Sequence, residues 1–243
     1  MCEMCRRNSI ERFEPSRRGV LGAAISTMGL LLASAAGAKE MKAPPKPQNV
    51  LTPAASLERL QKGNARYVEG VSLRHDFKHE REALAGGQNP YAAVLSCADS
   101  RIAPEYAFDS GRGDLFVCRV AGNFANSESV ASLEYAVAEL GTPLILVLGH
   151  DACGAVSATI KSLKDNTTLP GHLPSLVEGI APAVKAVSGQ TGDTLANAIR
   201  QNVIDNVGKL SSATPILSAA VAQNKLKVVG GIYRLRDGRV EMV

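Results

Sequence analysis

The sequence predicts an α/β domain, with a mainly parallel sheet of four or five strands and helices on both faces. The apolar run 144–148 contains no polar residue, as expected for a parallel strand that is covered on both faces, and 92–96 is a second strand of the buried type. Segments with helical periodicity alternate with such strands along the chain. Hydrophobic residues make up 45% of the 243 residues, which is enough to bury the core of one domain.

The predicted elements begin at Thr52. This residue offers a capping hydroxyl and Pro53 occupies the first helical position, so we expect a helix from here to Val68, ended by Gly70. The later predicted elements are a helix over 76–84, strands 92–96 and 115–120, a helix from Asn126 or Ser127 to Leu140, strand 144–148, helices over 152–163, 173–187, 194–210 and 215–224, and strand segments 226–235 and 240–243. Gly230 and Gly231 within the last long strand indicate a bulge or a close approach of the backbone.

Residues 1–38 have the order of an export signal. Paired arginines, Arg17 and Arg18, precede an apolar run that is rich in small residues, and the run ends in an A-x-A pattern at 36–38. We interpret this segment as a twin-arginine signal, which predicts a periplasmic or otherwise exported protein. A retained N-terminal anchor is the alternative. The run is short for a membrane span, and we expect no stable span in the mature chain.

Residues 39–52 are rich in Lys and Pro and are expected to form a flexible linker, which leaves 53–243 as the folded domain. The formal net charge is only +4 and the sequence shows no basic stripe, so nucleic acid is not an expected partner. Only 4% of residues are aromatic and there is no Trp, so the core is expected to be aliphatic.

The five cysteines do not form a disulfide framework, because their number is odd and their spacing is irregular. Cys2 and Cys5 form a lone CxxC in the N-terminal tail, which is a weak signal for metal or redox chemistry. Cys97 and Cys153 each follow a predicted strand, and His150 lies three residues before Cys153.

These three side chains predict one zinc site. Zinc prefers four tetrahedral ligands drawn from thiolate, imidazole and carboxylate. Cys97 follows one strand, whereas His150 and Cys153 are expected at the start of the helix after another, where a single turn presents both. Ligands in an open α/β sheet gather at the carboxyl ends of the strands, near a topological switch point. Two thiolates and one imidazole leave the fourth position open, which is the catalytic pattern rather than the structural one.

CADSR at 97–101 followed by GHDACG at 149–154 resembles the β-class carbonic anhydrases, whose signature is Cys-x-Asp-x-Arg and then His-x-x-Cys-Gly. The resemblance is close over 57–156 and looser over the rest of the domain. It includes GQNP before the first strand, the segment FDSGRGDLFVCRVAGN, and SLEYAV on the following helix.

The resemblance implies an enzyme with one Zn²⁺ per chain that hydrates carbon dioxide reversibly to bicarbonate and a proton. Hydroxide bound to the zinc would attack the carbon of CO₂. In carbonic anhydrases with three His ligands, the pKa of zinc-bound water falls from 15.7 to about 7. Thiolate ligands should raise this value somewhat, so activity is expected to rise with pH through the neutral-to-alkaline range.

Asp99 and Arg101 would be the catalytic residues beside the metal. When Asp99 pairs with Arg101 it stays ionised and can orient what is bound to zinc. In the family this Asp can also move onto the metal as a fourth ligand in a closed state. The alternative is a plain salt bridge that closes a turn.

The resemblance also implies a substrate pocket and an oligomer. Gln88 occupies the position of an amide that contacts bound substrate, and Phe116, Ala121 and Tyr135 align with the apolar pocket for CO₂. The family's site lies at a subunit interface, so several of these side chains would come from the partner of a homodimer or a dimer of dimers. The N-terminal helical arm is expected to pack on that partner.

The sequence departs from one form of the family. Members with a bicarbonate-controlled closed form carry a Trp three residues before the first Cys, where this chain has Val94. We therefore expect an open site, with Asp99 on zinc only at low pH, if at all. Arg119 matches an arginine of that regulatory site, and without the Trp we interpret it as structural.

The remaining candidates carry weaker signals. His75 and His79 lie four residues apart and could form a second metal site or relay protons, although no carboxylate or thiol companion is evident. His172 is expected to be exposed, and Cys118 is expected to be a buried apolar thiol.

Three alternative functions stay open. Carbonyl sulfide or carbon disulfide could be hydrolysed on the same scaffold, because the same nucleophile attacks them. The protein could be a non-catalytic, zinc-stabilised binding protein, although the Asp99–Arg101 pair argues against this. Redox or nucleophilic cysteine chemistry would require no bound zinc.

Overall fold

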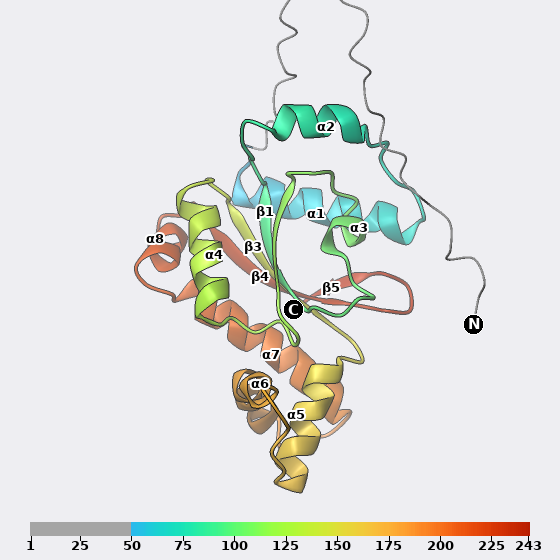
Figure 1. Ribbon diagram of the computed structural model, residues 1–243, viewed down its shortest axis with the longest axis vertical. Coiled ribbons are helices and arrows are strands. Elements are labelled where there is room, and N and C mark those ends of the chain that lie inside the picture. The colour runs from blue at the N-terminus through green and yellow to red at the C-terminus, as the bar shows by residue number, and fades with distance from the viewer. Residues whose placement is uncertain (1–49) are drawn as a thin grey trace, which may run out of the picture. The chain divides into compact units, whose positions relative to one another are not determined.

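The computed structural model describes residues 50–243, so the predicted signal, Cys2, Cys5 and most of the predicted linker lie outside the described residues. Strands and helices alternate in the middle of this part of the chain, and a run of helices precedes the last two strands (Figure 1). Their order is α1 (Pro53–Val68), α2 (Phe77–Leu84), β1 (Ala92–Ser96), α3 (Pro104–Ala107), β2 (Leu115–Arg119), α4 (Ser127–Ala138), β3 (Leu144–His150), α5 (Gly154–Asp165), α6 (Pro174–Ala186), α7 (Thr194–Ser211), α8 (Ile216–Ala222), β4 (Lys227–Tyr233) and β5 (Val240–Met242).

The five strands form one sheet in the order β2-β1-β3-β4-β5. All neighbouring strands are parallel except β4 and β5, which are antiparallel. The chain builds β2 on one side of β1 and then crosses to build β3 on the other side. The boundary between β1 and β3 is therefore the topological switch point, where ligand sites of open α/β sheets form. This confirms the predicted fold class.

Alternate side chains of the central strands point to opposite faces of the sheet, because side-chain direction alternates along a strand. On one face, Ala93, Leu95 and Val147 pack in a cluster with residues of α4, α6, α7 and α8. On the other face, Val94 and Leu146 pack in a cluster with residues of α1 and α3. Helices thus cover both faces, which explains why β1 and β3 are buried along their whole length (Figure 1).

Four helices begin where a polar side chain caps the first free N–H groups. Thr52 caps α1, Asp76 caps α2, Asn126 caps α4, and Asp193 caps α7. The first three caps agree with the predicted helix starts. Because the cap satisfies backbone donors that have no partner within the helix, these starts can be recognised in the sequence.

The structure corrects several details of the predicted elements. The short helix α3 was not predicted, β2 ends at Arg119, and β3 continues to His150. The β3–β4 register runs unbroken through Gly230 and Gly231, so there is no bulge there. A side chain at Gly230 would lie 2.6 Å from Val203 of α7, which makes a close approach the reason for the glycine.

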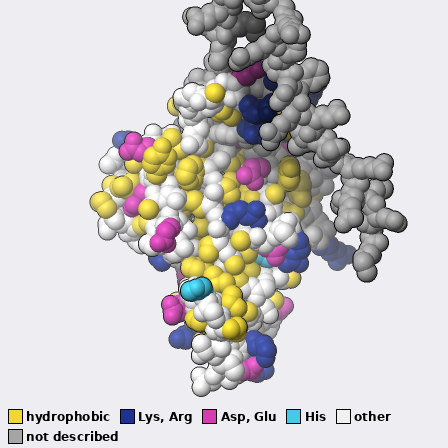
Figure 2. All heavy atoms as spheres, in the orientation of Figure 1, with side chains coloured by type: hydrophobic (Ala, Val, Ile, Leu, Met, Phe, Trp, Pro, Cys, Tyr) yellow, Lys and Arg dark blue, Asp and Glu magenta, His cyan; other side chains and the backbone are white. Residues whose placement is uncertain are grey.

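Acidic and basic side chains are interspersed on the face of the molecule shown in Figure 2. No helix within residues 50–243 is long and apolar enough to cross a membrane.

Candidate active site

The three predicted metal ligands come together at the carboxyl ends of β1 and β3. Cys97 follows the last residue of β1, His150 is the last residue of β3, and Cys153 is the N-cap of α5. Because β1 and β3 are neighbours in parallel register, their ends deliver Cys97 and His150 to the same place. The expectation that one helical turn presents both His150 and Cys153 is wrong, since His150 still belongs to the strand.

The ligand atoms of Cys97, His150 and Cys153 all lie within 4.8 Å of one another, and all three residues are buried. The Nδ1 atom of His150 lies 2.8 Å from the carbonyl oxygen of Asp151, which can only accept, so the ring carries its proton on Nδ1. Nε2 is left as a buried lone pair without a hydrogen-bond partner. A buried polar atom without a partner needs an explanation, and a metal ion supplies one.

The donor set fits zinc. Zinc lies about 2.3 Å from thiolate sulfur and about 2.0 Å from imidazole nitrogen, so its ligand atoms are about 4 Å apart. Both thiols are free rather than joined in a disulfide. Within residues 50–243 no other group of three His, Cys, Asp or Glu side chains could hold a metal ion.

The two thiols have opposite tendencies to ionise. The Cys153 thiol donates to the sulfur of Cys97, and the Gly122 N–H donates to the same sulfur. These contacts outweigh the effect of burial and lower the pKa of Cys97 to about 4. The contact with Cys97, together with burial, raises the pKa of Cys153. Without a metal, the contact between the two sulfurs therefore favours one thiolate and one thiol, with the negative charge favoured on Cys97.

Asp99 and Arg101 form a two-point ion pair beside this cluster. Arg101 donates from Nη2 to Asp99 Oδ2 at 2.7 Å and from Nε to Oδ1 at 2.9 Å, and its backbone N–H also donates to Oδ1 at 2.9 Å. The hydrogen bonds from Arg101 hold the pKa of Asp99 well below its usual range. Asp99 Oδ2 lies 3.9 Å from Nε2 of His150, so the carboxylate faces the metal ligands while it is held by Arg101.

Arg119, at the end of β2, binds the turn that carries this pair. Its guanidinium donates to the carbonyl oxygens of Cys97 at 3.0 Å, Asp99 at 2.7 Å and Ile102 at 2.8 Å. Three bonds to backbone carbonyls agree with the interpretation of Arg119 as structural. Val94, at the position of the family's regulatory Trp, is fully buried in the core.

Within one chain, the predicted substrate residues do not surround the metal ligands. Gln88 precedes β1 and is exposed, so it lies at the opposite end of that strand from Cys97. Phe116 lies on the edge strand β2, where it pairs with Ala93, and its ring centroid lies 6.4 Å from that of Tyr135 on α4. Ala121 lies nearer the cluster, directly before Gly122.

The other candidate residues lie away from the cluster. Cys118 is half-buried on β2, so the prediction of full burial is wrong: β2 is the outermost strand and has a neighbour on one side only. His75 lies 3.2 Å from Glu80 and His79 lies 2.6 Å from Asp76, so each does have a carboxylate companion. They still form no metal cluster within residues 50–243.

Sequence reasoning missed one member of the site, the backbone N–H of Gly122, which donates to Cys97 Sγ at 3.2 Å. Gly122 has a φ of +86°, a conformation in which other residues are strained. A side chain there would also lie 2.4 Å from Ile180. Almost every residue type has a backbone N–H, so the sequence does not identify such a donor. The one indication was the glycine, which permits this backbone conformation.

Comparison with known proteins agrees with this geometry. Residues 92–240 match the family model described as carbonic anhydrase. The chain is 40% identical over 189 residues to "Carbonic anhydrase 2" of Mycobacterium tuberculosis, which covers 77% of this chain and 91% of that protein. It is 38% identical over 192 residues to a carbonic anhydrase of Mycolicibacterium smegmatis, covering 78% and 93% of the two chains.

Similarity to solved structures identifies the class of carbonic anhydrase. The fold is similar to that of the β-carbonic anhydrase CcaA, with a TM-score of 0.60 and 28% identity over 78% of this chain and 92% of that one. A structure of tetrameric β-carbonic anhydrases from Sordaria macrospora is similar at a TM-score of 0.60 and 25% identity, over 78% of this chain and 94% of that one. Fold, ligand cluster and sequence agree: the chain belongs to the β-class carbonic anhydrase family.

Proposed function

We propose that this protein catalyses the reversible hydration of carbon dioxide to bicarbonate and a proton, at one zinc ion held by Cys97, His150 and Cys153. The observation that carries this proposal is the buried Cys₂His cluster with an unpartnered Nε2 on His150. Zinc in such a site supplies a nucleophile at neutral pH, because it lowers the pKa of bound water.

The residues around the cluster have separate roles in this proposal. Asp99, kept ionised by Arg101, accepts a hydrogen bond at Oδ2 and orients the nucleophile. Arg101 also donates to the carbonyl oxygen of Ala152 at 3.4 Å, which ties the pair to the turn that precedes Cys153. Because Asp99 is held by two hydrogen bonds from the Arg101 side chain, we propose an open resting site, with Asp99 as a metal ligand only in a closed state.

The experiment is to measure zinc content and CO₂ hydration on the same preparation of the full chain. We expect about one zinc per chain, with loss of hydration when a chelator removes it. Cys153→Ser should lose both zinc and activity, whereas Cys118→Ser, a matched change at a thiol outside the cluster, should keep both. Zinc-free active protein would contradict the proposal. Carbonyl sulfide hydrolysis far exceeding CO₂ hydration would favour the alternative substrate.

We also propose that the active unit is at least a homodimer whose site is completed by the partner. Gln88 is exposed and lies at the far end of β1 from its own Cys97. A groove of about 750 Å³ with Val71, Phe77 and Tyr106 among its lining residues lies nearby, and these three are 53–75% exposed. Exposed apolar patches of this kind mark interaction surfaces. The similar Sordaria macrospora enzymes are described as tetrameric.

Export is a separate proposal, which rests on the sequence of residues 1–38 alone. A reporter that is active only outside the cytoplasm, fused after residue 52, should depend on Arg17 and Arg18. Replacing both arginines with Lys should abolish the activity of the reporter, and unchanged reporter activity would contradict the twin-arginine interpretation.

A further inference from the structure

Two buried asparagines on α7 face the loop that contributes the N–H to Cys97. Asn202 and Asn206 are 1% and 5% exposed and lie one helical turn apart. The loop, which we call the Gly122 loop and define as residues 121–125, connects β2 to α4. The side-chain hydrogen bonds of the two asparagines go to the loop and to each other rather than to the metal ligands. Burial of such polar side chains is unfavourable unless they are hydrogen-bonded.

Hydrogen bonds connect the loop to α7 at two points, and a further one connects Gly122 to the sulfur. The N–H of Ala125 donates to Oδ1 of Asn206 at 2.7 Å. Nδ2 of Asn206 donates to the side-chain oxygen of Asn202 at 3.2 Å and to its carbonyl oxygen at 2.7 Å. Nδ2 of Asn202 then donates to the carbonyl oxygen of Gly122 at 2.8 Å, and the N–H of Gly122 donates to Cys97 Sγ at 3.2 Å.

The backbone partners fix which way each amide points. A backbone N–H can only donate and a backbone carbonyl can only accept, so the orientations of Asn206 and Asn202 are determined at both ends. Gly122 is thus held on its two sides, by Cys97 at its N–H and by Asn202 at its carbonyl.

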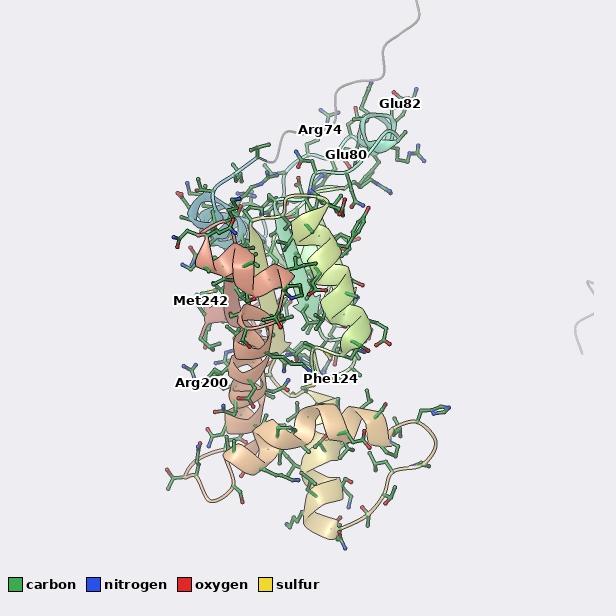
Figure 3. The ribbon with its side chains drawn as sticks, turned by 90° about the vertical axis from the view of Figure 1, so that its left-hand side faces the viewer. Arg74, Glu80, Glu82, Phe124, Arg200 and Met242 are labelled. Carbon is green, nitrogen blue, oxygen red and sulfur yellow. The ribbon has the colours of Figure 1, made fainter. Side chains whose placement is uncertain are left out.

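The rest of the loop is packed against a second helix. Phe124 lies between the sheet and α6 (Figure 3), and a side chain at Gly179 of α6 would lie 2.5 Å from its ring. The turn also has a backbone hydrogen bond of its own, from the Asn123 N–H to the Val120 carbonyl oxygen at 2.9 Å. The bond from Asn202 to the Gly122 carbonyl oxygen is a second constraint on the backbone at Gly122.

We propose that Asn202 and Asn206 are positioning residues of the metal site: they aim the Gly122 N–H at Cys97 and so control how this sulfur binds the metal. The inference rests on the proposed zinc site. Hydrogen bonds to metal ligands commonly tune the metal, and their removal typically reduces metal affinity or activity about 10- to 100-fold.

The test compares Asn202→Leu with Leu210→Ala in the full chain. Leucine has nearly the shape of asparagine but cannot donate to Gly122. Leu210 is a fully buried residue of α7 whose apolar side chain forms no hydrogen bond with the loop, so it serves as the control for lost stability. Zinc affinity is measured by competition with a chelator. Replacing zinc by Co²⁺ adds a charge-transfer absorption from the thiolates, which reports the Cys97–metal bond directly.

We expect Asn202→Leu to bind zinc about 10-fold more weakly. We also expect its Co²⁺ charge-transfer band to move to longer wavelength, because a thiolate with one hydrogen bond fewer is a better electron donor. Leu210→Ala should lower the melting temperature and change neither reading. If Asn202→Leu does not fold, Asn202→Ala, which leaves room for water, should shift both readings in the same direction.

A lower melting temperature with unchanged zinc affinity and an unchanged band in the Asn202 variant would overturn the inference, because the asparagines would then only stabilise the fold. If the wild-type protein binds neither zinc nor Co²⁺, the proposed function fails as well. If the wild-type protein binds metal and hydrates CO₂ while the Asn202 variant shows unchanged metal binding, only the inference about the asparagines fails.

Discussion

At the scale of single residues, the metal-free cluster of Cys97, His150 and Cys153 keeps a thiol proton that must be lost when zinc binds. The contact between the two sulfurs lowers the pKa of Cys97 and, together with burial, raises the pKa of Cys153, so the metal-free pair favours one thiolate and one thiol. Zinc binds thiolates, so the Cys153 proton must leave when the metal enters. The two sulfurs thus differ before the metal arrives and become equivalent in charge only afterwards.

Zinc affinity should therefore rise with pH through the neutral range. Each bound ion displaces at least one proton, so the apparent affinity increases about 10-fold per pH unit for each proton released. Chelator competition at several pH values measures the slope, and the proton released into weak buffer gives an independent value. An affinity that is independent of pH would show that both thiols are already deprotonated.

Replacing Asp99 by Asn should separate metal binding from catalysis. The amide keeps the shape of the carboxylate but loses its charge and part of its pairing with Arg101. We expect zinc content and melting temperature near those of the wild type, with CO₂ hydration reduced about 100-fold, the low end of the range for a lost proton-handling group. Unchanged hydration would mean that the Asp99–Arg101 pair only closes its turn.

The sequence identified Cys97, His150 and Cys153 because metal chemistry restricts the side chains that can serve. Asp99 and Arg101 were found because they share a short motif with Cys97. The roles of Asn202 and Asn206 could not be predicted in this way. They act through backbone groups of the Gly122 loop, and nothing in their residue type or spacing relates them to Cys97.

At the scale of elements, α1 packs against its own chain at one point of very close approach. A side chain at Gly63 would lie 2.0 Å from the carbonyl oxygen of Phe108, directly after α3. Asn64, the next residue, donates to the carbonyl oxygens of Ala107 and Gly238. The glycine lets the helix approach closely enough to form these bonds.

Gly63→Ala should therefore destabilise the protein by about 1–3 kcal/mol, as overpacked cores do. Gly208→Ala on α7 is the matched control, because nothing lies within 4 Å of its added side chain. There the better helix propensity of alanine should leave stability equal or raise it by up to about 1 kcal/mol. Thermal unfolding of both variants provides the measurement, and equal stability of the two would contradict close packing of α1.

Asp109 links the end of α1 to the segment after α3. Burial opposes its ionisation, but hydrogen bonds from Arg66 at 2.5 Å and from the Leu73 N–H at 3.0 Å lower its pKa below the usual value. A carboxylate whose pKa is lower in the folded state stabilises the fold above its unfolded pKa of about 3.9, and this contribution is lost as the pH falls through the folded pKa.

Asp109→Asn should lower the free energy of unfolding by about 1–3 kcal/mol at pH 7. The difference from wild type should shrink as the pH falls below about 4, because the carboxyl of the unfolded wild-type chain is then protonated, and it should vanish once the pH passes below the lowered pKa of the folded protein. Urea denaturation of both proteins at pH 7 and at a pH below about 4 measures this difference in free energy of unfolding. A difference that stays constant with pH would assign the effect to altered packing rather than to charge.

Most elements could be predicted because the signals that define them are local. Caps such as Thr52 and Asn126 and the apolar run of β3 lie within the segments they specify. The four-residue helix α3 was missed because it is too short for a periodic pattern. The half-burial of Cys118 was missed because it depends on the position of β2 at the edge of the sheet, which emerges only when the strands assemble.

At the scale of the whole molecule, Gln88 and Cys97 lie at opposite ends of β1. Five residues at about 3.3 Å each separate the two ends of the strand by roughly 17 Å. A site that uses both residues must therefore take Gln88 from another chain. On α2 at this end of the molecule, Glu82 is exposed, whereas Glu80 turns back to His75 (Figure 3).

Mixing two inactive variants tests this arrangement. Gln88→Ala keeps its metal ligands and Cys97→Ala keeps its glutamine, so a dimer of one of each contains one complete site. Random reassociation in a two-fold dimer should restore about one quarter of the wild-type rate per chain. Size-exclusion chromatography verifies that the variants form dimers. A mixture no faster than the sum of its parts would place Gln88 outside the site.

The placement of the ligands on β1 and β3 has a consequence for the order of events during folding. Between Cys97 and His150 the chain must form α3, β2 and α4, and the two ligands meet only when the strands pair. Contacts between distant segments form late, because the entropy of the intervening loop opposes them. The metal therefore cannot act as a nucleus around which the chain collapses. We expect it to be captured by a nearly finished fold, so that zinc slows unfolding without accelerating folding.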